Sequence, residues 1–167
     1  YIKKYDEERE LTVMLMIDVS ASGFYGTGSI LKSDIMIELA SVLSFSAIKN
    51  NDKVGLLLFS DIVEKYIPPK KGKSHVLRVI REMVYHRSKD RKTDLGFALD
   101  HIQKVLKRKS IVFLLSDFWD DLFYQSMKRL NKKHDLINIQ ILDQSEVNLP
   151  KMGFIKLHDA ENLKSTW

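Results

Sequence analysis

Residues 11–22 read Leu-Thr-Val-Met-Leu-Met-Ile-Asp-Val-Ser-Ala-Ser, an apolar run that ends in one carboxylate and two hydroxyls. Its first seven residues have Thr12 as their one polar member, which is typical of a strand buried on both faces of a parallel sheet covered by helices. Ligands of open α/β sheets bind at the carboxyl edge of the strands. The polar groups that follow this strand therefore mark the predicted functional site.

Three oxygen-bearing side chains follow the strand at alternate positions, Asp18, Ser20 and Ser22. In an extended turn their oxygens can converge on one side and form a hard pocket made of oxygen alone. Such a pocket suits Mg²⁺ or Mn²⁺ better than Zn²⁺. Three ligands from one loop leave an octahedral ion incomplete, so we expect further oxygen ligands from other strand ends.

The composition predicts one compact domain. The chain has 167 residues, of which 44% are hydrophobic, enough for one core and too little for two ordinary domains. We expect residues 1–10, which begin at Tyr1, to be a charged lead-in from a longer parent chain, residues 11–158 to form the domain, and residues 159–167 to be a polar tail. The lack of cysteine excludes a disulfide framework and fits a reducing, cytoplasmic location.

Charge and hydropathy exclude two further classes of partner. The formal charge of +5 comes from 27 basic and 22 acidic residues, and the basic clusters carry neither interleaved aromatics nor a recognition motif. We therefore expect no nucleic-acid binding. No apolar run approaches the roughly 20 residues that cross a bilayer, so this segment is expected to have no membrane span. Membrane association of a parent chain stays open.

The rest of the chain alternates strand and helix patterns. Apolar or alternating runs predict strands at residues 54–59, 62–67, 111–115, 136–142 and 152–157. The strand at 62–67 is expected to be an antiparallel edge strand that Pro68 and Pro69 end, and the one at 136–142 to have one less buried face. Helices are predicted at residues 29–49, 74–84, 93–106 and 120–133. This order implies a Rossmann-like, doubly wound, mostly parallel α/β sheet with helices on both faces.

The apolar positions of each predicted helix indicate the face that packs on the sheet. The expected inward residues are Leu31, Ile35, Leu39, Val42, Leu43 and Ser46 in the first helix; Val76, Leu77, Ile80, Met83 and Val84 in the second, with Ser74 as its cap; Leu95, Ala98, Leu99, Ile102, Val105 and Leu106 in the third; and Leu122, Phe123, Met127 and Leu130 in the fourth.

Polar residues recur at two other predicted element ends, Thr93-Asp94-Leu95-Gly96 at a helix start and Ser116-Asp117 after a strand. With Asp18-x-Ser20-x-Ser22, these segments resemble the metal-ion-dependent adhesion site of the von Willebrand factor A (vWA) domain family, and the element order matches over nearly the whole chain. The resemblance implies a ligand set: Asp18, Ser20, Ser22, Thr93 and Asp117. In such sites the hydroxyls bind Mg²⁺ or Mn²⁺ directly, and the aspartates act mostly through bound waters.

The resemblance is closest to the vWA-like domains of a conserved bacterial family of unknown function that is often encoded beside MoxR-type AAA+ ATPases. The segments that carry it are Glu7-Glu8-Arg9-Glu10, Asp18-Val19-Ser20-Ala21-Ser22, residues 52–60, residues 67–72 and Thr93-Asp94-Leu95. Many members have a methionine after the second serine, where this chain has Gly23. That difference affects the flexibility of the loop and leaves the ligand set intact.

This resemblance implies a non-catalytic protein-interaction domain. An open coordination position on the ion accepts a carboxylate from a partner protein, and no chemical step is required. The implied role is work with a MoxR-type AAA+ ATPase in protein assembly or maturation. Contacts with the partner are expected from residues that surround the ion, namely Gly23, Phe24, Tyr25, Asp94 and Trp119.

Two alternatives stay open. A magnesium-dependent phosphatase of the haloacid dehalogenase type also has an aspartate after its first strand. Such an enzyme needs a second aspartate two residues later, and this chain has Ser20 at that position. A serine cannot protonate a leaving group at neutral pH. The other alternative is a vWA scaffold that has lost metal binding, in which Asp18 and Asp117 would cap neighbouring helices.

Overall fold

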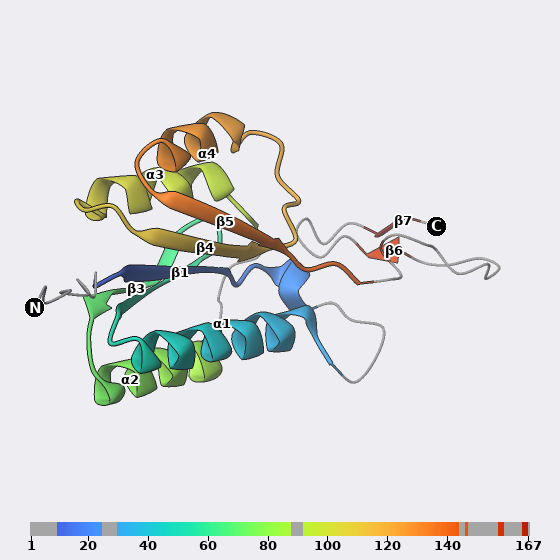
Figure 1. The fold of residues 1–167 in the computed structure, drawn as a ribbon. Helices are drawn as coiled ribbons and strands as arrows, with labels where there is room; N and C mark the ends of the chain where they lie inside the picture. The colour runs from blue at the N-terminus through green and yellow to red at the C-terminus, as the bar shows by residue number, and fades with distance from the viewer. Residues whose placement is uncertain are drawn as a thin grey trace, which may run out of the picture.

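A five-stranded sheet with strand order β3-β2-β1-β4-β5 forms the centre of the molecule (Figure 1). The computed structural model describes residues 10–24, 30–87, 92–143, 146, 157–158 and 165–166. The strands are β1 (Thr12–Asp18), β2 (Lys53–Phe59), β3 (Val63–Lys70), β4 (Ile111–Ser116) and β5 (Asp135–Gln140). All neighbours pair in parallel except β3, which runs antiparallel to β2 at the edge. The predicted fold class is confirmed.

Among the described residues, four α-helices cover the sheet on two faces, and a short 3₁₀ helix, η1 (Ala21–Phe24), follows β1. Figure 1 shows α1 (Lys32–Lys49) and α2 (Lys73–Tyr85) on one face, and α3 (Leu95–Val105) and α4 (Tyr124–Asn131) on the other. The central strand β1 supplies both layers, because Leu15 and Ile17 pack toward α1 and α2 while Met14 and Met16 pack toward α3 and α4. Burial of both faces explains its continuous apolar sequence.

The face of α1 that packs on the sheet differs from the prediction. The residues buried there are Lys32, Met36, Ala40, Ser44 and Ala47. Of the predicted stripe, Ile35, Leu39, Val42 and Ser46 are exposed, and Leu31 and Leu43 are partly buried. Small side chains at Ala40, Ser44 and Ala47 let the helix lie close to the sheet, and Ile35, Leu39 and Val42 are left on the outer face. The helix also begins three residues later than predicted, at Lys32.

Two other helices need smaller corrections. In α2 the buried residues are Val76, Val79 and Met83, whereas Leu77 and Val84 are exposed, and the cap position is Gly72 rather than Ser74. The fourth helix begins at Tyr124 rather than residue 120, so Leu122 lies in the preceding loop and is 88% exposed. In α3 the predicted residues Leu95, Ala98, Leu99 and Ile102 are buried.

The edge strand β3 continues through Pro68 and Pro69 to Lys70, so the prolines do not end it as predicted. A proline lacks the N–H that a sheet needs, and an edge strand tolerates this loss. The pairing of β2 with β3 is irregular around Gly55. A Cβ at Gly55 would lie 2.6 Å from Met14 Cε and 2.9 Å from Pro69 Cγ, so glycine gives Pro69 the room to pack there.

The last predicted strands also differ in detail. The strand β5 spans Asp135–Gln140 rather than 136–142, and its Ile137 is 42% exposed, as suits an edge strand. Of the predicted strand at 152–157, residues 152–156 lie outside the described residues. The strand β6 (Leu157–His158) pairs antiparallel with β7 (Ser165–Thr166) in a separate two-stranded sheet. Within the described part of the chain, no helix has the length and apolar character that crossing a membrane requires.

Candidate functional site

The carboxyl ends of the two central strands bring Asp18 next to Ser116 and Asp117. The parallel register places Ile17 opposite Leu115, so the polar residues that follow lie side by side. The Ser116 hydroxyl donates a hydrogen bond of 2.7 Å to Asp18 Oδ2. Asp18, Ser116 and Asp117 are all buried. Two carboxylates predicted from segments about a hundred residues apart therefore share one end of the sheet, as expected for parallel strands.

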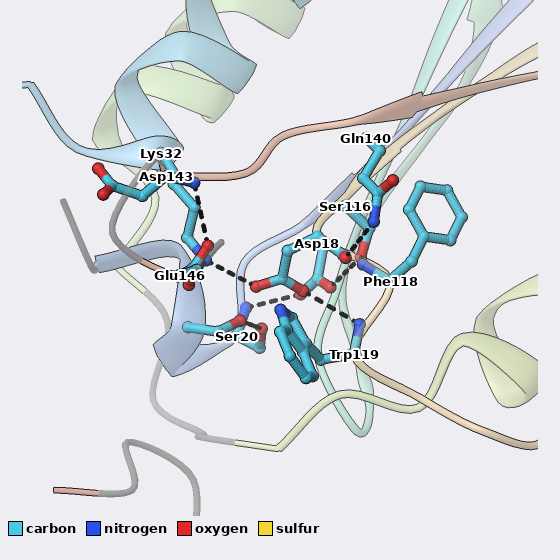
Figure 2. Close-up of polar contacts among 11 residues, drawn as sticks. Asp18, Ser20, Lys32, Ser116, Phe118, Trp119, Gln140, Asp143 and Glu146 are labelled. Atoms are coloured by element: carbon cyan, nitrogen blue, oxygen red, sulfur yellow. Dashed lines mark hydrogen bonds and ion pairs between the residues drawn. The ribbon is translucent and has the colours of Figure 1, made fainter. Parts of the chain in front are cut away.

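The loop after β1 turns back toward Asp18. The Ser20 N–H donates to Asp18 Oδ1 at 2.9 Å, and the Gly23 N–H donates to the Ser20 carbonyl at 3.1 Å. This turn sets the hydroxyl oxygens of Ser20 and Ser22 at 3.0 Å from each other. Ser20 is buried and Ser22 is partly exposed. The turn thus brings Ser20 to the Asp18 carboxylate (Figure 2) and places the Ser22 hydroxyl beside that of Ser20.

The loop after β4 fixes the Asp117 carboxylate. Its Oδ1 accepts a long hydrogen bond of 3.4 Å from the Trp119 N–H, and the Gln140 side chain donates to the Asp117 carbonyl at 3.1 Å. Between them, Phe118 has a positive φ of 61°, which a side chain of that size adopts at a cost. The Phe118 N–H donates to Ser116 Oγ at 3.0 Å, which helps to hold this strained turn.

A lysine outside the predicted set of site residues enters the same site. Lys32 is the first residue of α1 and is 2% exposed. Its Nζ lies 2.9 Å from Asp117 Oδ2 and 2.7 Å from Glu146 Oε1 (Figure 2). Glu146 Oε2 in turn accepts from the Asp143 N–H at 3.0 Å. One ammonium therefore bridges the β4 loop and the segment that follows β5.

The charges at this edge affect each other. Burial raises the pKa of Asp18, and the negative charge of Asp117 adds to that rise, whereas hydrogen bonds from Ser116 and Ser20 oppose it. Burial works against the charged form of Lys32, but its bonds to Glu146 and Asp117 outweigh burial and raise the pKa of Lys32. The ammonium is therefore positive at neutral pH, and it compensates part of the negative charge of the two carboxylates that it contacts.

The start of α3 lies at the same edge. The Asp94 N–H donates to the carbonyl of Ser60, which follows β2, and the Leu95 N–H donates to Asp120 Oδ2, in the loop after β4. Thr93 directly precedes Asp94 and is partly buried. Asp94 is the helix cap, because its Oδ1 accepts from the Phe97 N–H at 2.7 Å. Its role toward a partner stays a prediction.

The other predicted partner residues have varied positions. Gly23 is buried, and a Cβ there would lie 3.8 Å from Ser33 Cβ, an ordinary contact. Phe24 ends η1, and Tyr25 lies outside the described residues. Trp119 is 62% exposed on the loop that carries Asp117. Leu122, on the same loop, adds a further exposed apolar side chain that the prediction had placed in the core.

One of the residues that the prediction missed, Lys32, left a signal in the sequence. A lysine in the first turn of a helix faces the positive end of the helix dipole, which is unfavourable unless an anion compensates it. Lys32 occupies that position, and Asp117 and Glu146 are the anions. Ser116 adjoins Asp117 at the predicted strand end, although the implied ligand set did not include it. Glu146 left no comparable signal, because its partner is 114 positions away.

The donor atoms at this edge fit a hard divalent cation. Asp18 and Asp117 supply buried carboxylates, and Ser20 and Ser22 supply adjacent hydroxyls. Oxygen donors of this kind are what Mg²⁺ and Mn²⁺ prefer. Among the described residues, no group of three or more acidic, histidine or cysteine side chains is placed to hold a metal. The fit therefore depends on the two aspartates together with hydroxyls, and Lys32 already holds one oxygen of Asp117.

Comparison with solved structures agrees with the fold. The conserved hypothetical protein BatB from Bacteroides thetaiotaomicron is similar with a TM-score of 0.65 and 15% identity, over 78% of this chain and 66% of that one. The SpRpn10 VWA domain is similar with a TM-score of 0.51 and 16% identity, over 80% and 77% of the two chains. At these identities the likeness establishes a vWA-like fold.

Comparison with sequences places the chain in a family. The uncharacterized protein Mb1516 of Mycobacterium bovis is 26% identical over 166 residues, which is 97% of this chain and 52% of that protein. The chain thus spans about half the length of that curated relative. The model of the family described as "Protein of unknown function DUF58" matches residues 1–167. The chain, a vWA-like α/β domain with Asp18 and Asp117 at its carboxyl edge, therefore belongs to the DUF58 family.

Proposed function

We propose that this domain is a non-catalytic, divalent-cation-dependent protein-interaction module. The ion is Mg²⁺ or Mn²⁺, and the site is the predicted set Asp18, Ser20, Ser22, Thr93 and Asp117. A protein partner offers an acidic residue to the bound ion. The vWA-like fold agrees with a role as an interaction scaffold.

The observation that carries the proposal is the excess of buried negative charge at the carboxyl edge. Asp18 and Asp117 are 3% and 2% exposed, and the Lys32 ammonium that contacts Asp117 is shared with Glu146. Burying a carboxylate whose negative charge is not fully compensated costs several kcal/mol of stability. A divalent cation would offset this cost, so the arrangement favours cation binding.

The neighbouring residues would each have a definite task. The Ser116 hydroxyl and the Ser20 N–H hold the two Asp18 oxygens, which fixes the orientation of that carboxylate. The Ser20 and Ser22 hydroxyls already lie 3.0 Å from each other. A bound cation would supply positive charge and an open coordination position for a partner carboxylate.

Exposed apolar residues beside the site suit a protein partner. Trp119 and Leu122 are 62% and 88% exposed on the loop that follows Asp117. Aromatic side chains are enriched in protein interfaces, where one apolar anchor can add much of the binding energy. We further propose, from the resemblance alone, that the partner belongs to a complex with a MoxR-type AAA+ ATPase in protein assembly or maturation.

Thermal unfolding of the metal-stripped chain tests the proposal. A cation at ten times its dissociation constant adds about 1.4 kcal/mol, or roughly 3 °C, to a domain of this size. We expect Mn²⁺ and Mg²⁺ to raise the melting temperature, and Ser22→Ala and Thr93→Ala to remove the rise. The control is Ser41→Ala, since the Ser41 hydroxyl donates to the Ile37 carbonyl within α1 and serves no predicted ligand role. An equal rise in all four chains would locate the ion elsewhere.

A further inference from the structure

The Lys32 ammonium contacts Asp117, the same carboxylate that the proposed cation would use. Lys32 Nζ is 2.9 Å from Asp117 Oδ2, a charge-assisted hydrogen bond, and the lysine is 2% exposed. Lysine is almost never buried to this extent unless it is paired. Lys32 and Asp117 therefore form a specific ion pair. This pair occupies Oδ2 of Asp117, a proposed metal ligand.

We propose that Lys32 is an internal competitor for the divalent cation, so that it sets the affinity of the site. This inference rests on the proposed function. Without the ion, the ammonium compensates Asp117. When the ion binds near Asp117, directly or through a water, the two positive charges repel each other at short range, and the Lys32–Asp117 bond must break. Lys32 would thus set the affinity for the cation through its contact with the proposed metal ligand Asp117.

Glu146 gives the displaced ammonium a second partner. Its Oε1 lies 2.7 Å from Lys32 Nζ, and its Oε2 is held by the Asp143 N–H at 3.0 Å. When Asp117 turns to the ion, Lys32 keeps this ion pair and is not left buried and unpaired. The free-energy cost of breaking the Lys32–Asp117 bond is therefore moderate. The attraction between a divalent cation and Asp117 can exceed that cost.

Replacement of Lys32 separates this role from a purely structural one. In Lys32→Met, Asp117 loses its ammonium, so the metal-free chain is expected to melt at a lower temperature than the wild type. The same change removes the competitor, so Mn²⁺ is expected to bind about tenfold tighter or more and to raise the melting temperature by a larger amount. A lysine that only supported the loop would weaken both the metal-free stability and Mn²⁺ binding when removed.

Lys53→Met is the matched control for the change in net charge. Lys53 pairs with Glu10 at 3.4 Å, and it begins β2, at the opposite end of the sheet from Asp18. Its removal is expected to leave Mn²⁺ affinity unchanged within about twofold, because exposed charges at that distance are screened. Lys32→Gln, which keeps a hydrogen-bond donor, provides a second variant in case Lys32→Met does not fold without metal.

The experiment measures Mn²⁺ affinity and melting temperature, with and without Mn²⁺, for these four 167-residue chains. Tighter Mn²⁺ binding in Lys32→Met or Lys32→Gln, with no change in Lys53→Met, supports the inference. Equal or weaker binding in the Lys32 variants overturns it and leaves the cation-dependent function in place. Mn²⁺ binding by none of the chains overturns both the inference and the proposed function.

Discussion

The Ser116 hydroxyl donates a 2.7 Å hydrogen bond to Asp18 Oδ2, and this bond joins the carboxyl ends of the two central strands. Both residues are buried, so water does not replace the bond when it is lost. Ser116 also accepts from the Phe118 N–H at 3.0 Å, which makes it the link between Asp18 and the Asp117 loop. The geometry of the site thus depends on a serine outside the implied ligand set.

Ser116→Ala is expected to lower the free energy of unfolding by about 1–3 kcal/mol, because it leaves a buried carboxylate oxygen and an N–H without their partner. Urea unfolding of the metal-free chain measures this. Ser44→Ala is the control, since Ser44 is equally buried but its hydroxyl donates to the Ala40 carbonyl inside α1. That change is expected to stay within about 0.5 kcal/mol. Equal losses in the two variants would contradict the importance of the bond to Asp18.

Asp18→Asn is expected to separate stability from cation binding. Burial raises the pKa of Asp18, so keeping this carboxylate charged costs free energy in the folded protein. An asparagine removes that charge and can still accept from the Ser20 N–H. We expect the metal-free variant to be at least as stable as the wild type in urea, and the Mn²⁺-induced rise in melting temperature to disappear. A variant that keeps the full rise would show that Asp18 takes no part in holding the ion.

His134 is expected to make the domain less stable in mild acid. It is 1% exposed, and within the described part of the chain neither ring nitrogen has a hydrogen-bond partner. Burial lowers the pKa of His134, with the charge of Lys133 adding to the effect and that of Asp135 opposing it. Below the ordinary value of about 6.5, the unfolded chain then binds the proton more readily than the folded one, and stability falls as the pH decreases.

Urea unfolding at about pH 7.5 and about pH 5.5 checks the effect of His134. The wild type is expected to lose free energy of unfolding between these values, and His134→Leu is expected to lose less, because leucine binds no proton. The same loss in both chains would mean that other groups cause the pH dependence.

The two faces of α1 are expected to respond differently to substitution. Met36 is 1% exposed, so Met36→Ala is expected to cost about 2–4 kcal/mol of stability through the cavity that it leaves. Val42 is 61% exposed, and Val42→Ala is expected to stay within about 0.5 kcal/mol. Urea unfolding of both variants measures the two costs. The opposite order would restore the face predicted from the sequence.

The fold could be predicted from the strands more fully than from the helices. Strands such as β1, with both faces buried, consist of almost nothing but apolar residues, so their position and the sheet edge that carries Asp18 and Asp117 follow from the sequence. The helix α1 misled the prediction because small and polar residues, Ala40 and Ser44 among them, face the sheet, while Val42 lies outside. A search for large apolar residues does not find a helix face on which small residues let the helix pack close to the sheet.

The candidate site was predictable in its local part. Asp18, Ser20 and Ser22 converge because they follow one strand, and their spacing is visible in the sequence. The contact of Lys32 with Asp117 joins residues 85 positions apart, and the contact with Glu146 joins residues 114 positions apart. Such pairs depend on how helix and sheet pack, which a single sequence does not encode in any local pattern.

Calorimetric titration of Mn²⁺ into the metal-stripped chain tests the central claim most directly. The account predicts binding to one site in the wild type, loss of that binding in Asp117→Asn, and tighter binding in Lys32→Met. Absence of binding heat in the wild type and in Lys32→Met, with melting temperatures unchanged by Mn²⁺, would contradict it. The carboxyl edge would then be a vWA-like scaffold in which the Lys32 ammonium takes the place of the ion.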